Sequence, residues 1–382
     1  MRRRGWALVL AVLVGRAPLT AQPADDAKRL APPATAPRAR ASIDASSHYE
    51  TNVRFFGPAV AGDRYNRAGG VVAGGVANAR TRLEVEAHGE IVRFDLLRDL
   101  DRETYDLGLL VSHRVNPRLS TSLSARALTS AAPAGLEQLT LAFQPLTVVR
   151  AQNAVGSMVL RLSPRVDLTT ELDGTRVRFD DAAFVGGGTA GGRVVVGVRP
   201  TARQLRGVIT EVRRATFAEQ VVYTGLLEGE WRQPVGRAQL AVRAGTTTLR
   251  VPGDADPLTV IPTGSVELMS EREPYQLAAR YAHAVTPVFG FGRALQSDQV
   301  SLSVARTRVR GTTLRVTVDG SRNVDPVDRA INVNFATATT EVRQYVGGGL
   351  TLAFTGFVRR RIEGDRANNA GGSVLAAFGG AR

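Results

Sequence analysis

Apolar and polar residues alternate at every second position through most of the chain. In the segment 104–115, for example, one side carries Tyr105 and Leu107, and the other carries Asp106 and Gly108. A period of two is typical of β-strands whose two faces meet different environments. The alternation therefore predicts an all-β protein.

Two alternating segments stop at a proline and resume at once, at Asn-Pro-Arg (116–118) and at Ser-Pro-Arg (163–165). The same device recurs more loosely around Pro200 and Pro234. Because proline lacks the N–H that a paired strand needs, these sites indicate short turns. One supersecondary unit is reused along the chain.

Segment length separates the two folds that such alternation permits, a soluble β-sandwich and a transmembrane β-barrel. Soluble strands usually have about 5 to 6 residues, whereas a tilted membrane strand needs about 9 to 11. The segments 104–115, 219–232 and 237–250 reach or exceed the longer figure. The pattern favours a transmembrane antiparallel up-and-down β-barrel.

Breaks between the segments give about 18 strands, with 16 as the alternative count. Barrels of bacterial outer membranes have an even number of strands, short periplasmic turns and longer extracellular loops. An even count places both termini in the periplasm. Among the longer connections, we expect 51–69 and 285–296 to be loops, and we propose that 129–151 folds over the barrel mouth as a constriction.

The N-terminal region predicts export. Residues 1–21 combine three arginines with a short apolar core, as in a signal peptide. Residues 22–40 are rich in proline and alanine, which is typical of a flexible linker, here in the periplasm. The barrel is expected to span 41–382. The apolar core of the signal is too short for a helical membrane anchor, which needs roughly 20 residues.

Composition excludes several kinds of chemistry. The chain contains no cysteine and four histidines, none of which has a neighbour at metal-ligand spacing. We therefore expect no enzyme activity, no cofactor and no metal. The formal net charge is +14, but the arginines are dispersed among 35 acidic residues. A nucleic-acid-binding protein concentrates its basic residues on one face, so we expect no nucleic-acid partner.

The chain-long succession of alternating segments, the turns of the Ser/Asn-Pro-Arg type and the Glu-Thr-Asn element at 50–52 resemble the β-barrel porin 2 family of bacterial outer-membrane proteins. The resemblance covers about 41–382 and implies an outer-membrane barrel of ill-defined function. Its partners would be outer-membrane lipid, lipopolysaccharide and the barrel-assembly machinery. No oligomeric state follows from the sequence.

The alternation assigns a charged set of residues to the inner face of the barrel. We expect this lumen network to comprise Arg82, Glu84, Glu86, Asp106, Arg114, Arg126, Asp167, Glu171, Asp173, Arg193, Arg199, Glu228, Glu230, Arg243, Arg315, Asp319 and Arg359. The same face would also carry Glu90, Arg118, Arg237 and Arg361. Basic and acidic positions nearly balance, so the set does not indicate anion selectivity.

A sharper hypothesis concerns the hairpin 166–199. Partners on antiparallel strands share a constant sum of residue numbers, and Asp173 with Arg193 and Asp167 with Arg199 have the same sum. One register would therefore pair both.

These features favour a porin-like barrel that lets small polar solutes, or an exported molecule, cross the outer membrane. Two alternatives remain open at this point. One is a closed structural or adhesive barrel whose surface loops bind partners, and the other is an exported soluble β-sandwich binding protein.

Overall fold

The chain was analysed as a computed structural model. The structure describes residues 38–381 except for short gaps, which fall at 52–61, 131–147, 183, 219, 254–257, 273, 291, 308–310, 327–331, 348 and 362–366. The expected signal peptide and nearly all of the expected linker lie outside the described residues.

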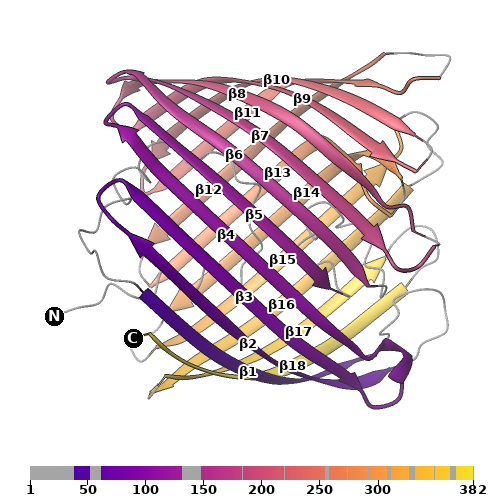
Figure 1. Cartoon of the computed structure of the whole chain (residues 1–382). Coiled ribbons are helices and arrows are strands. Elements are labelled where there is room, and N and C mark those ends of the chain that lie inside the picture. The colour runs from indigo at the N-terminus through magenta and orange to yellow at the C-terminus, as the bar shows by residue number, and fades with distance from the viewer. Residues whose placement is uncertain are drawn as a thin grey trace.

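The described chain forms one closed sheet of 18 antiparallel strands (Figure 1). Each strand pairs with the next one along the chain, and β18 returns to pair with β1, for example at Ser46 and Leu375. The expectation of an up-and-down barrel with 18 strands is confirmed. The strands are β1 (Arg38–Glu50), β2 (Asp63–Ala77), β3 (Thr81–Phe94), β4 (Arg102–Asn116), β5 (Leu119–Ser130), β6 (Val149–Ser163), β7 (Val166–Phe179), β8 (Gly187–Thr201), β9 (Gln204–Phe217), β10 (Val221–Val235), β11 (Ala238–Arg250), β12 (Thr259–Arg272), β13 (Tyr275–Val288), β14 (Arg293–Thr307), β15 (Thr312–Val324), β16 (Asn332–Gly347), β17 (Leu350–Arg361) and β18 (Ala367–Ala381).

Aliphatic side chains cover the outside of this barrel. Leu172 is 72% exposed, Ile43 is 66% exposed and Val72 is 65% exposed, although all three lie in the middle of regular strands. In a soluble sandwich such residues would be buried against a second sheet, and the described strands form a single closed sheet. The β-sandwich alternative is therefore wrong, and the exposed aliphatic face is the one that contacts lipid.

Some boundaries differ from those expected. Strand β1 begins at Arg38, inside the expected linker. Strand β2 begins at Asp63, so all of 63–69 is strand and not loop. Strand β13 extends to Val288 and β14 begins at Arg293, which leaves a short connection where 285–296 was expected. Alternation is masked in these segments because loop-like Gly and Pro residues occur within the strands.

The turns at the end of the barrel where β1 begins and β18 ends repeat one hydrogen-bonded unit. Asn116 Oδ1 accepts hydrogen bonds from the backbone N–H of Arg118 at 2.8 Å and of Leu119 at 2.9 Å. The Ser163 hydroxyl likewise accepts from Arg165 at 3.2 Å, and Asn78 Oδ1 accepts from Arg80 at 2.8 Å. Side chains of Asn and Ser favour turns by this mechanism. The Ser/Asn-Pro-Arg turns are therefore confirmed, and the acceptor residue two positions before the arginine defines the unit better than proline does.

Successive turns are also tied to one another. The carbonyl oxygens of Arg80, Arg118 and Arg165 each accept a 2.7 Å hydrogen bond from a backbone N–H of the next hairpin. The donors are Arg114, Arg161 and Arg199 respectively. Strand register shifts directly after Arg114 and Arg161, and Arg199 lies within the shift between Val198 and Thr201. Each bulge thus leaves an N–H free to hold the neighbouring turn.

Pro200 and Pro234 do not lie in turns. They occupy the ends of β8 and β10, and the turns follow at 202–203 and 236–237. Pro200 falls within the register shift between Val198 and Thr201, where a missing N–H is tolerated. Within the described residues, no helix is long and apolar enough to cross a membrane, a finding that does not bear on membrane-spanning strands.

Candidate functional site

The interior of the barrel is the candidate functional site. With 18 strands about 4.8 Å apart and tilted by about 40°, the wall is roughly 36 Å across between backbones. Side chains projecting from such a wall do not meet in the middle, and barrels of this size enclose an aqueous channel. What narrows the lumen must therefore be sought in its charged residues and in its loops.

The strand register and the exposure pattern place the 17 residues of the expected lumen set on the face opposite the exposed aliphatic residues, and their role as a network stays a prediction. The strand pairing shows this for Glu230, which is directly opposite Arg243 and is only 6% exposed. By contrast, Arg118 and Arg237, which were also assigned to this face, lie in the turns at the periplasmic end. Alternation does not extend through a turn, which is why it misplaced them.

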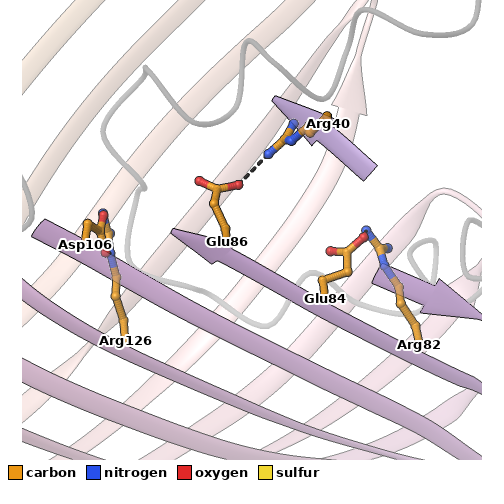
Figure 2. A network of polar contacts seen from close by, with 6 residues as sticks. All are labelled: Arg40, Arg82, Glu84, Glu86, Asp106 and Arg126. Carbon is orange, nitrogen blue, oxygen red and sulfur yellow. Dashed lines mark hydrogen bonds and ion pairs between the residues drawn. The ribbon is translucent and has the colours of Figure 1, made fainter. Parts of the chain in front are cut away.

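Charged residues of β1 to β5 form one group on the wall (Figure 2). Arg40 reaches across β2 to form an ion pair with Glu86, and Arg126 of β5 pairs with Asp106 of β4. On β3, Arg82 Nη2 lies 2.6 Å from Glu84 Oε1. Nearer the extracellular end, Arg67 pairs with Glu90, which is almost buried. Each carboxylate of this group is neutralised by an arginine beside it.

A second group lies on β6 to β11 and is less exposed. Glu230 Oε1 accepts from Arg232 Nη2 at 2.7 Å and lies 2.8 Å from Arg243 Nη2. Asp173 Oδ1 lies 3.1 Å from Arg213 Nη2, and Arg213 Nε also bonds Glu211 at 3.0 Å. Carboxylates shared between arginines in this way hold the guanidinium groups in fixed positions.

The register expected for the hairpin 166–199 is wrong by two residues. Arg193 lies opposite Glu171, and Asp167 lies opposite Gly197. Nevertheless, Arg199 Nη1 is 2.7 Å from Asp167 Oδ2, because the long arginine side chain spans the diagonal to its neighbour. Asp173 has Arg213 of β9 as its ion-pair partner instead of Arg193.

On the inner face from β13 to β17, arginines outnumber acidic residues. Arg315 lies opposite Glu341 in the register, and Glu341 Oε1 bonds Arg343 Nη2 at 3.0 Å. The guanidinium of Arg359 lies 4.5 Å from the centre of the Phe357 ring, in a cation–π contact. Asp319 and Glu228 face the lumen without an ion pair recorded between described residues.

The extracellular end of the lumen is lined differently, by apolar residues. Phe289, in the connection between β13 and β14, is 1% exposed and packs edge-on against Phe217 of β9, with ring centres 5.8 Å apart. The buried cluster around them consists of Val149, Ala151, Val177, Ala215, Val222, Leu249, Val251 and Ala294. A connection from one part of the wall thus covers the inner faces of β6, β7 and β9 to β11.

Two connections meet inside this end of the barrel. Val185 of the β7–β8 connection exchanges backbone hydrogen bonds of 2.8 Å and 3.1 Å with Gly290 of the β13–β14 connection. Gly290 has a φ of 94° and Gly292 a φ of 69°, which residues with side chains rarely adopt. Because five strands separate β8 from β14 in the sheet, this bridge spans a large part of the mouth. The expected constriction by 129–151 lies largely outside the described residues and stays a prediction.

A second connection, between β3 and β4, also folds onto the inner face. The Asp63 carboxylate, 2% exposed, accepts hydrogen bonds from the backbone N–H of Leu96 and Leu97. Leu100 packs on Val92 in a small apolar cluster there. The extracellular mouth is therefore narrowed from two sides by short, well-anchored connections.

Sequence reasoning missed several of these residues. Arg40 had been assigned to the linker. Arg213 is adjacent to Arg214, so the sequence alone does not indicate which of the two arginines faces the lumen. Phe289 lies in a Val-Phe-Gly-Phe-Gly stretch whose glycines signalled a loop but not its direction. Nothing in a period of two indicates that a loop turns inward.

Taken together, a closed sheet with lipid-facing aliphatic residues, a charged lumen and periplasmic termini defines a transmembrane β-barrel of the bacterial outer membrane.

Comparisons with known proteins support this class at the level of the fold. The chain is similar to Pseudomonas aeruginosa OccK9 (OpdG), with a TM-score of 0.53 and 12% identity over 91% of this chain and 98% of that one. It is also similar to Pseudomonas aeruginosa OccK5 (OpdH), with a TM-score of 0.52 and 10% identity over 90% of this chain and 98% of that one. For Acinetobacter baumannii OccAB3 the TM-score is 0.50 and the identity 9%, over 90% of this chain and 99% of that one. The Pseudomonas neighbours are outer-membrane porins, which confirms the expected resemblance to a porin barrel. No family model and no curated protein matches the sequence.

Proposed function

We propose that this barrel is a porin-type channel for passive passage of small polar solutes, and that it acts without chemistry of its own. The observation that carries the proposal is the direction of the ion pairs. Those described above join residues on one strand or on strands no more than two apart, as Arg40 and Glu86 do. They run along the wall and leave the centre to water.

This arrangement argues against the closed structural barrel. A lumen sealed by its charged residues would need ion pairs that cross it, from β3 to β12 for example. The contact that does span the mouth, between Val185 and Gly290, is a backbone bridge at the extracellular end. It narrows the entrance, while the ion pairs between described residues below it stay along the wall, which is the arrangement expected of a selective channel.

The test is ion conductance of the refolded barrel in planar lipid bilayers, with swelling of liposomes in sugars and amino acids as a second readout. Stepwise current increments and solute-dependent swelling support the channel. A barrel that inserts, as shown by its heat-dependent gel mobility, but carries no current and no solute would contradict it and would favour the adhesive alternative.

A further inference from the structure

The outer face of the barrel carries a belt of arginines near its extracellular end. Strand pairing places them on the same face as the lipid-facing aliphatic residues, and each is exposed. They are Arg64, Arg93, Arg150, Arg176, Arg178, Arg214, Arg250, Arg322 and Arg360. At the periplasmic end of this face, the strand positions occupied by arginine are 206, 272 and 306.

The height of the belt matches the edge of the hydrocarbon layer. Arg176 lies ten residues along β7 from its periplasmic end at Val166. Arg214 lies equally far along β9 from Gln204. At about 3.3 Å per residue and a tilt of about 40°, ten residues rise about 25 Å. This equals the height of the apolar band that outer-membrane barrels present to lipid, about 25 Å. The arginines thus stand at the level of the outer-leaflet head groups.

Five of these arginines are concentrated on the strands β6 to β11, and their arrangement is unfavourable without an anion. Arg150 lies directly opposite Arg178 in the strand register, and like charges at opposed positions repel. Arg214 and Arg250 flank Tyr223 on either side. The carboxylate recorded next to this group is Asp180, 3.2 Å from Arg150. No other acidic residue occupies the outward positions in the described upper half of these strands.

Small residues leave room between these arginines. Gly188 lies opposite Arg176, and Ala190 lies opposite Arg214. Strand β8 therefore contributes almost no side-chain volume between β7 and β9, which are about 10 Å apart across it. Arginines therefore flank a strand that has only small residues at these positions.

Directly below these positions the surface becomes aliphatic. Leu172 on β7 and Val212 on β9 are 72% and 66% exposed, with Gly192 of β8 between them, and Val194 and Val196 continue the aliphatic surface of β8 toward the periplasmic end. A ligand for the whole surface must therefore carry phosphate groups above and several acyl chains below. Free phosphate would leave the aliphatic part uncovered.

We propose that Arg150, Arg176, Arg178, Arg214 and Arg250 form a docking surface for a phosphorylated outer-leaflet glycolipid, the lipid A part of lipopolysaccharide. Guanidinium groups bind phosphate oxygens in pairs and would share the two phosphates of the glycolipid. The bound anion would also remove the repulsion between Arg150 and Arg178. This inference depends on the orientation of the barrel in the membrane and is independent of whether the lumen conducts.

The test compares two triple variants with the same change in charge. The first, R176Q/R178Q/R214Q, removes arginines of the docking surface. The matched control, R165Q/R203Q/R237Q, removes exposed arginines of the periplasmic turns. Binding of bisphosphorylated lipid A to the refolded barrels is measured in detergent, alongside dephosphorylated lipid A and inorganic phosphate as a competitor.

We expect the wild type and the control to bind bisphosphorylated lipid A equally, and the first variant to bind about 100-fold more weakly, at about fivefold for each arginine lost. Dephosphorylated lipid A should bind weakly to all three. The proposal is overturned if the first variant binds like the wild type, if the phosphates of the lipid make no difference, or if inorganic phosphate displaces the lipid at equal concentration. If the triple variant does not refold, R178Q alone should weaken binding about fivefold.

Discussion

Arg199 Nη1 lies 2.7 Å from Asp167 Oδ2, although the residue opposite Asp167 on β8 is Gly197. Asp167 also lies 3.6 Å from Arg161 of β6 and is only 8% exposed. One carboxylate at the periplasmic end of the lumen thus connects three neighbouring strands. Gly197 permits the contact because it places no side chain between Asp167 and the guanidinium of Arg199.

Replacing this carboxylate should destabilise the barrel. In an Asp167→Asn variant, two arginines lose their shared negative partner while remaining partly buried. We expect the free energy of unfolding to fall by about 1 to 3 kcal/mol. The measurement is urea unfolding of the refolded barrel, followed by the loss of its heat-dependent gel mobility.

Asp319→Asn is the matched control, because Asp319 also faces the lumen but has no ion pair recorded between described residues. It should unfold at nearly the wild-type urea concentration. Equal shifts for the two variants would show that the Arg161–Asp167–Arg199 contact contributes nothing specific.

Much of this fold can be predicted from the sequence because the barrel wall is a single sheet with two different environments on its faces. Each strand residue contacts either lipid or the lumen, so apolar and polar residues alternate over long segments, as around Asp106 and Leu107 in β4. Strand number, connectivity and the face of residues within strands could be read from that period, but the direction of Arg118 and Arg237 in the turns could not. The register could not, because a slip of two residues keeps every side chain on its face, so Asp167 faces the lumen whether it lies opposite Gly197 or Arg199.

The mouth of the lumen was not predictable in the same way. Phe289 and Val185 lie in connections, where side-chain direction depends on tertiary packing and not on a local period. The apolar inner lining at Val149 and Val177 was equally hidden, because the alternation is inverted at these strand ends: the valines face the lumen, and Arg150, Arg176 and Arg178 face outward. The charged half of the site was therefore readable from the sequence, and the apolar half was not.

Phe289 should control how wide the extracellular mouth is. A Phe289→Ala variant removes the ring that packs on Phe217 and should release the β13–β14 connection from the wall. Loss of a buried ring costs about 3 kcal/mol, here confined to the loop. We expect single-channel conductance to rise, with the barrel still folded.

Phe354→Ala provides the control for this variant, since Phe354 is 50% exposed on the lipid face. The same loss of a ring there should leave conductance unchanged. Wild-type conductance in Phe289→Ala would mean that the apolar cluster does not limit the current.

The pair of Arg40 and Glu86 offers a test of charge selectivity (Figure 2). In Glu86→Gln the arginine keeps its charge without a partner, and the lumen becomes more positive by one unit. The reversal potential under a salt gradient should move toward anion preference. Arg40→Gln should move it by a similar amount in the opposite direction, because it leaves the carboxylate unpaired. Shifts of the same sign, or none, would place this pair away from the conduction path.

The turn between β10 and β11 should depend on backbone conformation alone. Gly236 has a φ of 60°, and a Cβ built there would meet no atom within 4 Å, so Gly236→Ala introduces backbone strain without a clash. We expect a loss of about 1 to 2 kcal/mol in the free energy of unfolding, measured by urea unfolding. Gly156 in β6 is equally open but has no positive φ, so Gly156→Ala should be neutral or slightly stabilising. An unchanged stability of Gly236→Ala would mean that the turn can relax into a conformation that alanine tolerates.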